Sequence, residues 1–510
     1  MGLKAKTSMF KIEDKTIPQL QAALEDGKVT SFKLAKIYLN RISKFDRNGP
    51  KLNSVIETNP DVLGIAKDLD LERRGGRTRG NLHGIPVLLK ANIATTDRMR
   101  TTAGSLALVE SRPKKEAFVV EKLRAAGAII LGMANMSEWA GFRSNSSSSG
   151  WSALGGQTHN PYALDRTPGG SSSGSAVAVA ANLATVALGT DTGGSILWPC
   201  SVNCVVGIRP TLGLVSRAGV VPVAHSQDVV GPVARTVTDA SILLGALVGV
   251  DPNDPVTRDS EGKSYADYTQ FLDTDGLDGA RIGVARDIYF GYNANADSIT
   301  NAAIKKMHDL GARIIDPANI PSAKQMLNSD SEMTVLFHEF KHDMNQYLSQ
   351  LSASSVRTLK DIIDFNEAHR NDELKYSGQE LLMNAQETTS LEDAKYLRAL
   401  EEDRNLSRQK GIDAVMDEHN LDALLMPSNS PSWAIDLIYG DPMEGARSAR
   451  PAALAGYPAI TVPAGFVFGL PVGITLIGRA YSEPMLIKLA YAFEQSTLAR
   501  IPPKFLPTVA

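Results

Sequence analysis

The chain has 510 residues, of which 43% are hydrophobic and 21% charged, and 53 basic against 56 acidic side chains give a net charge of -3. This composition is typical of a globular protein with one large domain or a few ordinary ones. Nucleic-acid binding requires clustered lysine and arginine, so a balanced charge without basic blocks excludes a nucleic acid as the default partner. We therefore expect a small molecule as the partner.

Little in the sequence points to export or to a membrane. The positively charged start, residues 1–7, is not followed by the apolar stretch of a signal peptide. The longest weakly apolar stretch, residues 176–188, is shorter than the roughly 18 residues that span a bilayer. Cys200 and Cys204 can form neither a disulfide framework nor a complete zinc site, and we expect both to be buried. The expected compartment is the cytoplasm, although a secreted or periplasmic protein trimmed of its signal peptide would look the same.

The first half of the chain alternates helical patterns with apolar runs. Hydrophobic periodicity predicts two short amphipathic helices between residues 15 and 45, separated near Gly27. Compact apolar runs follow at 85–89, 128–131 and 186–188, with a helical pattern at 117–126. This alternation predicts an α/β core whose strands are buried on both faces.

Residues 250–430 differ in composition, because they are charged and rich in helix formers, and they predict a helical insertion or cap on the core. The apolar pattern punctuated by glycine and proline returns at 455–478 and would complete the sheet. The expected organisation is one domain over 1–510, with N-terminal helices (1–75), the core (76–245), the insertion (250–430) and a C-terminal return to the sheet (440–500). The serine-rich tract 144–150 has the composition of a linker, but no compositional change beside it marks a boundary.

Residues 338–342 read H-E-x-x-H on a predicted helix, the pattern in which two histidines bind zinc and the glutamate is a general base. A zinc peptidase needs a third ligand, but Asn345 and Leu348 stand where the extended motif has glycine and histidine. Glu367 is a conceivable substitute, yet no ligand motif surrounds it. We therefore expect a solvated helix here and no metal site.

Residues 170–174, GSSSG, match the nucleophile elbow G-x-S-x-G with Ser172 at the centre. Such a match is common in a run of glycine and serine. A hydrolase of that type also needs an acid and a histidine further along, and no later histidine has a context that singles it out. Ser172 is therefore a weak candidate for a nucleophile.

A third pattern joins Lys90, Ser171 and Ser195. Lys90 closes the apolar run HGIPVLLK, where the carboxyl end of a strand would present it to a site. Ser171 follows two glycines and opens twenty residues without a charge, and a helix starting there would favour negative charge at its N-terminus. Ser195 lies in a second glycine-rich turn, DTGGS.

These residue types fit nucleophilic catalysis by a serine, which needs a base, and a neutral lysine can act as that base. At its ordinary pKa only about one lysine in 2,500 is neutral at pH 7, so burial must favour the uncharged form. The N–H groups of Gly193 and Gly194 would converge on a developing oxyanion, an effect typically worth about 3 to 4 kcal/mol. The alternative is a surface lysine and two flexible loops.

The same segments carry a family resemblance. The sequence resembles the amidase signature family, and within it the bacterial peptide amidases, in HGIPVLLKAN, GGQTHNPYALDRTPGGSSSGSAVAVAA, LGTDTGGSI and GIRPTLGLVSRAGVVPVAHSQDVVGPVARTVTDA. The likeness extends to NGPKLNSVIETNP, SEWAGFRSNSSSSGWSA and the C-terminal AGYPAITVPAG and GLPVGITLIG, and so to nearly the whole chain. It implies an α/β fold in which a large mixed β-sheet is covered on both faces by helices and carries a helical insertion.

The resemblance also implies roles for individual residues. Ser195 would be the nucleophile that forms an acyl-enzyme, Ser171 a bridging serine that follows a cis peptide bond, and Lys90 the general base. The backbone N–H groups of Thr192, Gly193, Gly194 and Ser195 would form the oxyanion hole. No metal and no cofactor is implied.

The chain departs from the common family pattern at two places. Ala91 replaces an aspartate after Lys90, and the loss of that anion should make the lysine easier to deprotonate. After Ser195 the sequence continues Ile-Leu-Trp where many members have Ile-Arg. We expect Leu197 and Trp198 to line an apolar or aromatic acyl pocket that disfavours substrates bearing a carboxylate. Trp139 is a further pocket candidate, with a core position as the alternative.

The expected function is a serine-dependent amidase, an amidohydrolase acting on linear amides through a Ser-Ser-Lys triad. C-terminal peptide amides, cleaved with release of ammonia, are the first-choice substrates, and aryl acylamides or carbamates remain alternatives because small changes in a pocket move specificity. A transamidation subunit is a further alternative, which the net charge of -3 does not favour. A monomer or homodimer acting on a small molecule or short peptide is expected.

Overall fold

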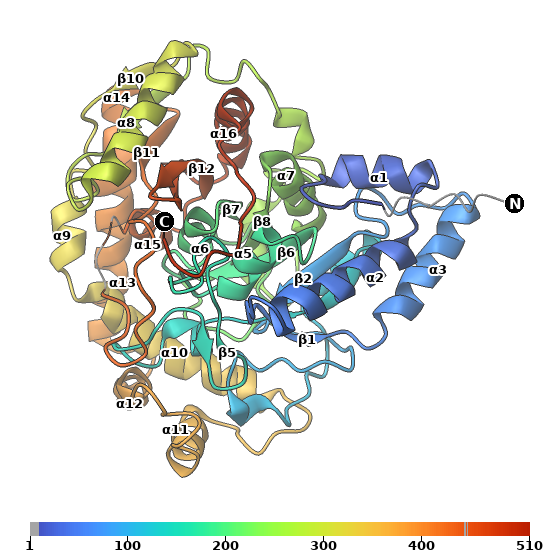
Figure 1. The fold of residues 1–510 in the computed structure, drawn as a ribbon. Coiled ribbons are helices and arrows are strands. Elements are labelled where there is room, and N and C mark those ends of the chain that lie inside the picture. Colours follow the sequence, from blue (N-terminus) through green and yellow to red (C-terminus); the bar gives the residue numbers. More distant parts are fainter. Residues whose placement is uncertain (1–9, 443–444, 446, 510) are drawn as a thin grey trace, which may run out of the picture.

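The computed structural model describes residues 10–442, 445 and 447–509. The first residues, considered above for a signal peptide, lie outside this range. Within it, no helix combines the length and the apolar character needed to cross a lipid bilayer. The molecule is built on a large sheet with helices packed around it; the N-terminal helices lie at one side, and the helices of residues 294–419 gather mainly at the opposite side and below (Figure 1).

Eleven strands form one mixed sheet in the order β1-β3-β2-β6-β8-β7-β12-β13-β11-β9-β10. Strands β2, β3 and β6 run parallel to one another, whereas β8 is antiparallel to β6 and begins beside the carboxyl end of β6. The strands are β1 (Val55–Thr58), β2 (Pro86–Lys90), β3 (Ile129–Ala134), β6 (Val186–Asp191), β7 (Val206–Arg209), β8 (Val229–Ala234), β9 (Arg281–Val284), β10 (Arg313–Ile315), β11 (Ala423–Pro427), β12 (Ala459–Val467) and β13 (Leu470–Ile477). A separate hairpin pairs β4 (Trp151–Ser152) with β5 (Gly156–Gln157).

The α-helices occupy the segments between these strands. They are α1 (Ile17–Glu25), α2 (Ser31–Arg41), α3 (Val62–Arg74), α4 (Phe118–Ala125), α5 (Ser173–Ala180), α6 (Leu197–Val202), α7 (Val237–Leu247), α8 (Ala294–Asp309), α9 (Ala323–Asn328), α10 (Ser331–Ser349), α11 (Leu359–Ala368), α12 (Glu380–Gln386), α13 (Ala394–Ser407), α14 (Asp413–His419), α15 (Arg450–Ala455) and α16 (Glu483–Thr497).

The elements predicted in the first half are confirmed. Two amphipathic helices flank Gly27, and the three apolar runs form β2, β3 and β6, every residue of which is buried. Helix α5 has no polar face, and every one of its residues is buried. Its residues are glycine, alanine, serine and valine, and these small side chains let neighbouring elements pack closely around the helix. Both cysteines are buried and free.

The region 250–430 is mostly helical, as expected, but it also supplies β9, β10 and β11 to the sheet. These strands have three to five residues each and stand between long charged helices. Segments that short do not alter the composition of the region, so the sequence did not reveal them. The insertion therefore forms one edge of the central sheet in addition to covering it.

The C-terminal apolar segment returns to the sheet as β12 and β13, between β7 and β11. Strands from residues 1–75, 76–245, 250–430 and 440–500 thus belong to a single sheet. The serine-rich tract 144–150 is not a free linker. Its Ser144 and Ser148 are buried, and it is hydrogen bonded to Glu380 and to Asp441.

Candidate active site

Lys90 ends strand β2 inside the protein, with none of its surface exposed. Its Nζ lies 2.8 Å from Ser171 Oγ, 2.7 Å from Thr190 Oγ1 and 3.1 Å from the Thr190 carbonyl oxygen. Because β2 and β6 are parallel neighbours, their carboxyl ends bring Lys90 and Thr190 together. The structure therefore joins Lys90 to Ser171 across 81 residues of sequence.

Burial lowers the pKa of Lys90 to about 7, although the charges of Asp191 and Asp228 act in the opposite direction. At that pKa about half of the molecules carry a neutral amine at pH 7. A neutral lysine has a lone pair that accepts the Ser171 proton, while its two N–H bonds can serve the two Thr190 oxygens. This environment is compatible with the prediction that Lys90 is an uncharged base.

Ser171 follows a cis peptide bond with Gly170, as the resemblance implied. Ser171 is 2% exposed, and its carbonyl oxygen accepts a hydrogen bond from Ser137 N at 3.1 Å. Any side chain at Gly170 would collide with the hydroxyls of Ser137 and Ser149. The backbone that presents Ser171 is therefore enclosed by the serines of two neighbouring loops.

Ser195 lies in the turn between β6 and α6 and is half-buried. Its carbonyl oxygen accepts a hydrogen bond from Ser172 N at 3.1 Å, which ties this turn to the start of α5. Among the described residues no hydrogen bond joins the hydroxyl groups of Ser171 and Ser195. The Lys90–Ser171 half of the predicted relay is present, and the transfer between the serines stays a prediction.

The oxyanion hole differs from the prediction at Gly194. The Gly194 N–H donates to Asp191 Oδ1 at 2.7 Å, and the Ile196 N–H donates to Asp191 Oδ2 at the same distance. The Gly194 N–H therefore already has an acceptor, Asp191, the first residue of the turn. An aspartate that precedes a turn commonly accepts from the backbone that follows, and this signal in DTGGS was available in the sequence.

Three of the predicted oxyanion donors remain. In the part of the chain that the structure describes, the N–H groups of Thr192, Gly193 and Ser195 have no protein acceptor. Gly193 is also exposed, so a ligand can approach its backbone. The turn therefore offers unpaired donors beside Ser195, as stabilisation of an oxyanion requires.

Two charged groups that the sequence analysis missed, the buried Arg209 and the partly buried Asp228, hold this turn in place. Arg209 donates to Asp191 Oδ1 at 2.6 Å and to the Gln227 carbonyl at 2.6 Å, and both side chains of the Asp191–Arg209 pair are fully buried. Asp228 Oδ1 accepts from Thr192 Oγ1 at 2.6 Å, and burial raises the pKa of this carboxyl. Both lie within the family-like segment, but nothing in their local pattern reveals their spatial partners.

The three pocket candidates have different surroundings. Leu197 is 1% exposed and packs in a small core cluster with Ala449 and Ala452. Trp139 is 2% exposed and belongs to the main core cluster, which was its alternative assignment. Trp198 alone is half-buried, and its ring lies against the ring of Trp433.

The hypothesis that Ser172 is the nucleophile of a nucleophile elbow does not fit the structure. Ser172 is completely buried, and its hydroxyl donates to the Thr190 carbonyl at 3.0 Å and accepts from Thr190 N at 3.2 Å. A side chain without access to substrate cannot attack it. Ser172 instead fixes the start of α5 against the end of β6.

The H-E-x-x-H residues lie on α10 and are not uniformly solvated, contrary to expectation. Glu339 is fully buried and accepts from Ser226 N, Ser226 Oγ and Tyr396 Oη at 2.8 to 2.9 Å. His338 is 6% exposed and donates through Nδ1 to the Thr334 carbonyl. His338 and His342 instead have different partners, the Thr334 carbonyl for His338 and the Asp343 carboxylate for His342.

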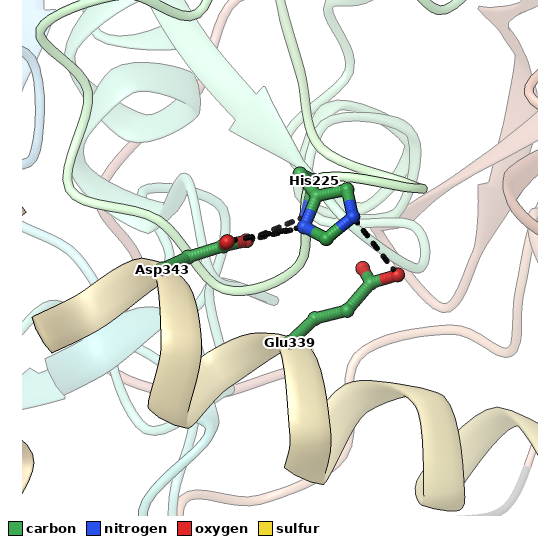
Figure 2. A group of neighbouring side chains, drawn as sticks. All are labelled: His225, Glu339 and Asp343. Atoms are coloured by element: carbon green, nitrogen blue, oxygen red, sulfur yellow. Dashed lines mark hydrogen bonds and ion pairs between the residues drawn. The ribbon is translucent and has the colours of Figure 1, made fainter. Parts of the chain in front are cut away.

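A different histidine meets this helix. His225 lies between Asp343, which is 2.9 Å from Nδ1, and Glu339, which is 3.4 Å from Nε2 (Figure 2). Burial opposes the charge of His225, but the hydrogen bond with Asp343 and the charge of Glu339 raise its pKa. Because its two nitrogens face different carboxylates that already have protein donors, the group fits an imidazolium held by two anions better than a metal site.

Comparison with known proteins gives one consistent result. The family model described as Amidase matches residues 33–487. A probable amidase from Arabidopsis thaliana is 44% identical over 507 residues, covering 98% of this chain and 93% of the relative. A glutamyl-tRNA(Gln) amidotransferase subunit from Thermoanaerobacter pseudethanolicus is 35% identical, covering 94% of this chain and 96% of the relative.

Solved structures agree with the sequence relatives. The native peptide amidase from Stenotrophomonas maltophilia superimposes with a TM-score of 0.92 at 47% identity, covering 97% of this chain and 99% of that one. The peptide amidase PAM, solved with the competitive inhibitor chymostatin, gives a TM-score of 0.93 at 47% identity over 97% and 100%.

Proposed function

This chain belongs to the amidase signature family of hydrolases, and we propose that within it the chain cleaves the C-terminal amides of short peptides, releasing ammonia. The likeness to two peptide amidase structures at 47% identity, over 97% of the chain, supports this substrate class. The observation that carries the mechanism is the contact between buried Lys90 and Ser171 at 2.8 Å.

In the proposed reaction neutral Lys90 accepts the Ser171 proton while Ser171 accepts the Ser195 proton. Ser195 Oγ then forms a bond with the amide carbon, and the N–H groups of Thr192, Gly193 and Ser195 bind the negative oxygen. Collapse breaks the carbon–nitrogen bond as the proton returns from Lys90 through Ser171 to the nitrogen, which leaves as ammonia. Water, deprotonated by the same relay, releases the carboxylic acid and restores Ser195.

The test measures ammonia release from amidated dipeptides, with free-acid dipeptides and aryl acetamides alongside. Wild type and Ser195→Ala are compared, each with and without EDTA. The proposal is supported if ammonia is released from the amidated peptides, if this release is lost in Ser195→Ala, and if EDTA does not change its rate. Ser195-dependent cleavage of aryl amides alone keeps the mechanism and discards the substrate, whereas activity that survives in Ser195→Ala overturns the mechanism.

Relatives that are amidotransferase subunits make glutamine a necessary further substrate in this panel. Their names describe a role in a larger assembly, and at 35–36% identity they are more distant than the peptide amidases. Ammonia release from glutamine that exceeds release from amidated dipeptides would favour that role for this chain.

A further inference from the structure

Trp198 and Trp433 form an aromatic pair beside the nucleophile. Trp198 lies three residues after Ser195, and its backbone N–H donates to the Gly194 carbonyl at 3.0 Å, so the ring is fixed to the catalytic turn. The ring centroids of Trp198 and Trp433 are 5.1 Å apart with the planes tilted by 35°. Neither ring belongs to a buried core cluster of the described residues, and both side chains keep part of their surface exposed.

Trp433 comes from the loop after β11, more than two hundred residues from Ser195, and three contacts fix it. Its carbonyl oxygen accepts from Thr167 N at 2.8 Å, close before Ser171 in the sequence. Its Nε1 donates to Asp441 Oδ1 at 2.9 Å. Asp441 Oδ2 in turn accepts from Ser149 N at 3.0 Å.

These contacts connect the aromatic pair to the chain segments that carry the two serines. Ser149, which Asp441 holds, lies against Gly170 immediately before Ser171. Trp433, which Asp441 also holds, stacks on the tryptophan that follows Ser195. The aromatic pair is therefore tied to the segment before Ser171 and to the turn that carries Ser195.

The pair also contains an unused polar group. Trp198 Nε1 is buried and has no hydrogen-bond partner among the described residues, whereas Trp433 Nε1 is satisfied by Asp441. A buried indole N–H normally finds an acceptor. The carbonyl oxygen of a bound peptide would be such an acceptor.

We propose that Trp433 and Trp198 form the wall that binds the side chain of the substrate residue bearing the scissile amide, and that they select apolar and aromatic residues there. Asp441 is the positioning residue that holds Trp433 against Trp198. This inference rests on the proposed function for the peptide nature of the substrate. It extends that function by naming the side-chain class and a specificity residue that the sequence did not reveal.

The test compares kcat/KM for N-acetyl-phenylalaninamide and N-acetyl-glycinamide in wild type, Trp433→Ala, Trp433→Phe and Asp441→Asn. We expect Trp433→Ala to lower the phenylalanine-to-glycine ratio about tenfold to a hundredfold, the range that apolar pocket contacts give. Trp433→Phe retains a ring and should recover most of the ratio. Asp441→Asn keeps only one acceptor oxygen and so loses one of its two partners, Trp433 Nε1 or Ser149 N. It should raise KM more for the phenylalanine substrate than for the glycine substrate.

The matched control is Tyr265→Ala, which removes an exposed ring from a different aromatic pair, an edge-to-face contact with Phe271 at 4.9 Å, and should leave the ratio unchanged. The inference is overturned if the phenylalanine-to-glycine ratio of kcat/KM is also unchanged in both Trp433 variants while their Ser195-dependent activity is intact. If wild type cleaves neither peptide amide, the proposed function fails by itself. The same variants are then compared on 3-phenylpropanamide and acetamide, where an unchanged ratio overturns the aromatic wall and a lowered ratio supports it.

Discussion

Two regions of the molecule contribute to the site in different ways. In residues 76–245 the contacts join neighbouring strand ends and one tight turn: Lys90 meets Ser171 and Thr190, and the Gly194 N–H meets Asp191. In residues 250–430 single long side chains reach the catalytic region from a helix. On α10, Glu339 and Asp343 hold His225, and Glu332 lies near Gly193.

The two regions differ in what fixes the distances between contacting groups. In the first region strand ends and tight turns fix the distances, because a backbone atom or a serine hydroxyl has little freedom to move. In the second region each contact depends on the rotation and register of a whole helix against the core. We therefore expect substitutions in the first region to act on the reaction itself and those in the second to act on stability.

The largest contrast is expected between two lysines that both donate hydrogen bonds inside the protein. Lys90→Ala removes the proposed base and should lower kcat/KM about 10²- to 10⁴-fold. Lys341→Ala removes a lysine of α10 that donates to the carbonyls of Gln386 and Thr388 and should leave kcat within about threefold. Steady-state kinetics with an amide substrate measures both, and equal losses would contradict the contrast.

Ion pairs are the exception to this division, because their contribution to stability follows their burial. Arg209→Ala leaves the buried Asp191 carboxylate without its cation and should cost about 3 to 5 kcal/mol of unfolding free energy. Arg286→Ala breaks the partly exposed pair with Asp316 in the second region and should cost about 0 to 1 kcal/mol. Denaturant unfolding measures both values, and a small loss for Arg209→Ala would show that the two backbone N–H donors suffice for Asp191.

The pH profile tests the charge environment of Lys90. Because the base must be unprotonated, kcat/KM should rise with pH through about 7, the pKa to which burial lowers Lys90. The negative charge of Asp228 raises that pKa, so Asp228→Asn should move the rising limb to lower pH. Asp343→Asn serves as the control in the second region and should leave the limb in place. A profile that is flat across pH 7 would contradict the assignment of Lys90 as the base.

A smaller effect, on stability only, is expected at His225. Its pKa is raised in the folded protein, so its ion pairs stabilise the fold below pH 6.5 and the stabilisation is lost as pH rises through the raised pKa. His225→Gln should therefore lower Tm more at pH 6 than at pH 9. Thermal unfolding of both proteins at the two pH values measures the difference. A deficit that grows toward pH 9 would mean that neutral His225 makes the stabilising contact.

No effect is expected from metal removal. The carboxylates of Glu339 and Asp343 already accept hydrogen bonds from protein groups, so EDTA should change neither Tm nor the amidase rate. Dialysis against EDTA followed by addition of zinc measures this. A fall in Tm that zinc reverses would identify the His225 group as a metal site, against our interpretation of Figure 2.

The sequence predicted most of what lies within short spans of chain. The strand ending in Lys90, the buried helix after Ser171 and the turn before Ser195 were found from local patterns, because each consists of neighbouring residues. The engagement of Gly194 by Asp191 was missed although it too is local. The strands β9, β10 and β11 were missed because strands of three to five residues do not stand out among charged helices.

The sequence by itself determined the α/β class and the burial of the core strands, and through its family resemblance it supplied Lys90, Ser171 and Ser195 as the proposed catalytic residues. The tertiary structure decided which distant side chains complete the site: Arg209 on Asp191, Asp228 on Thr192, and Trp433 on Trp198. The physical reason is that strands, helices and turns follow from local periodicity and backbone sterics. A contact between remote side chains depends instead on how whole elements pack, which no local pattern records.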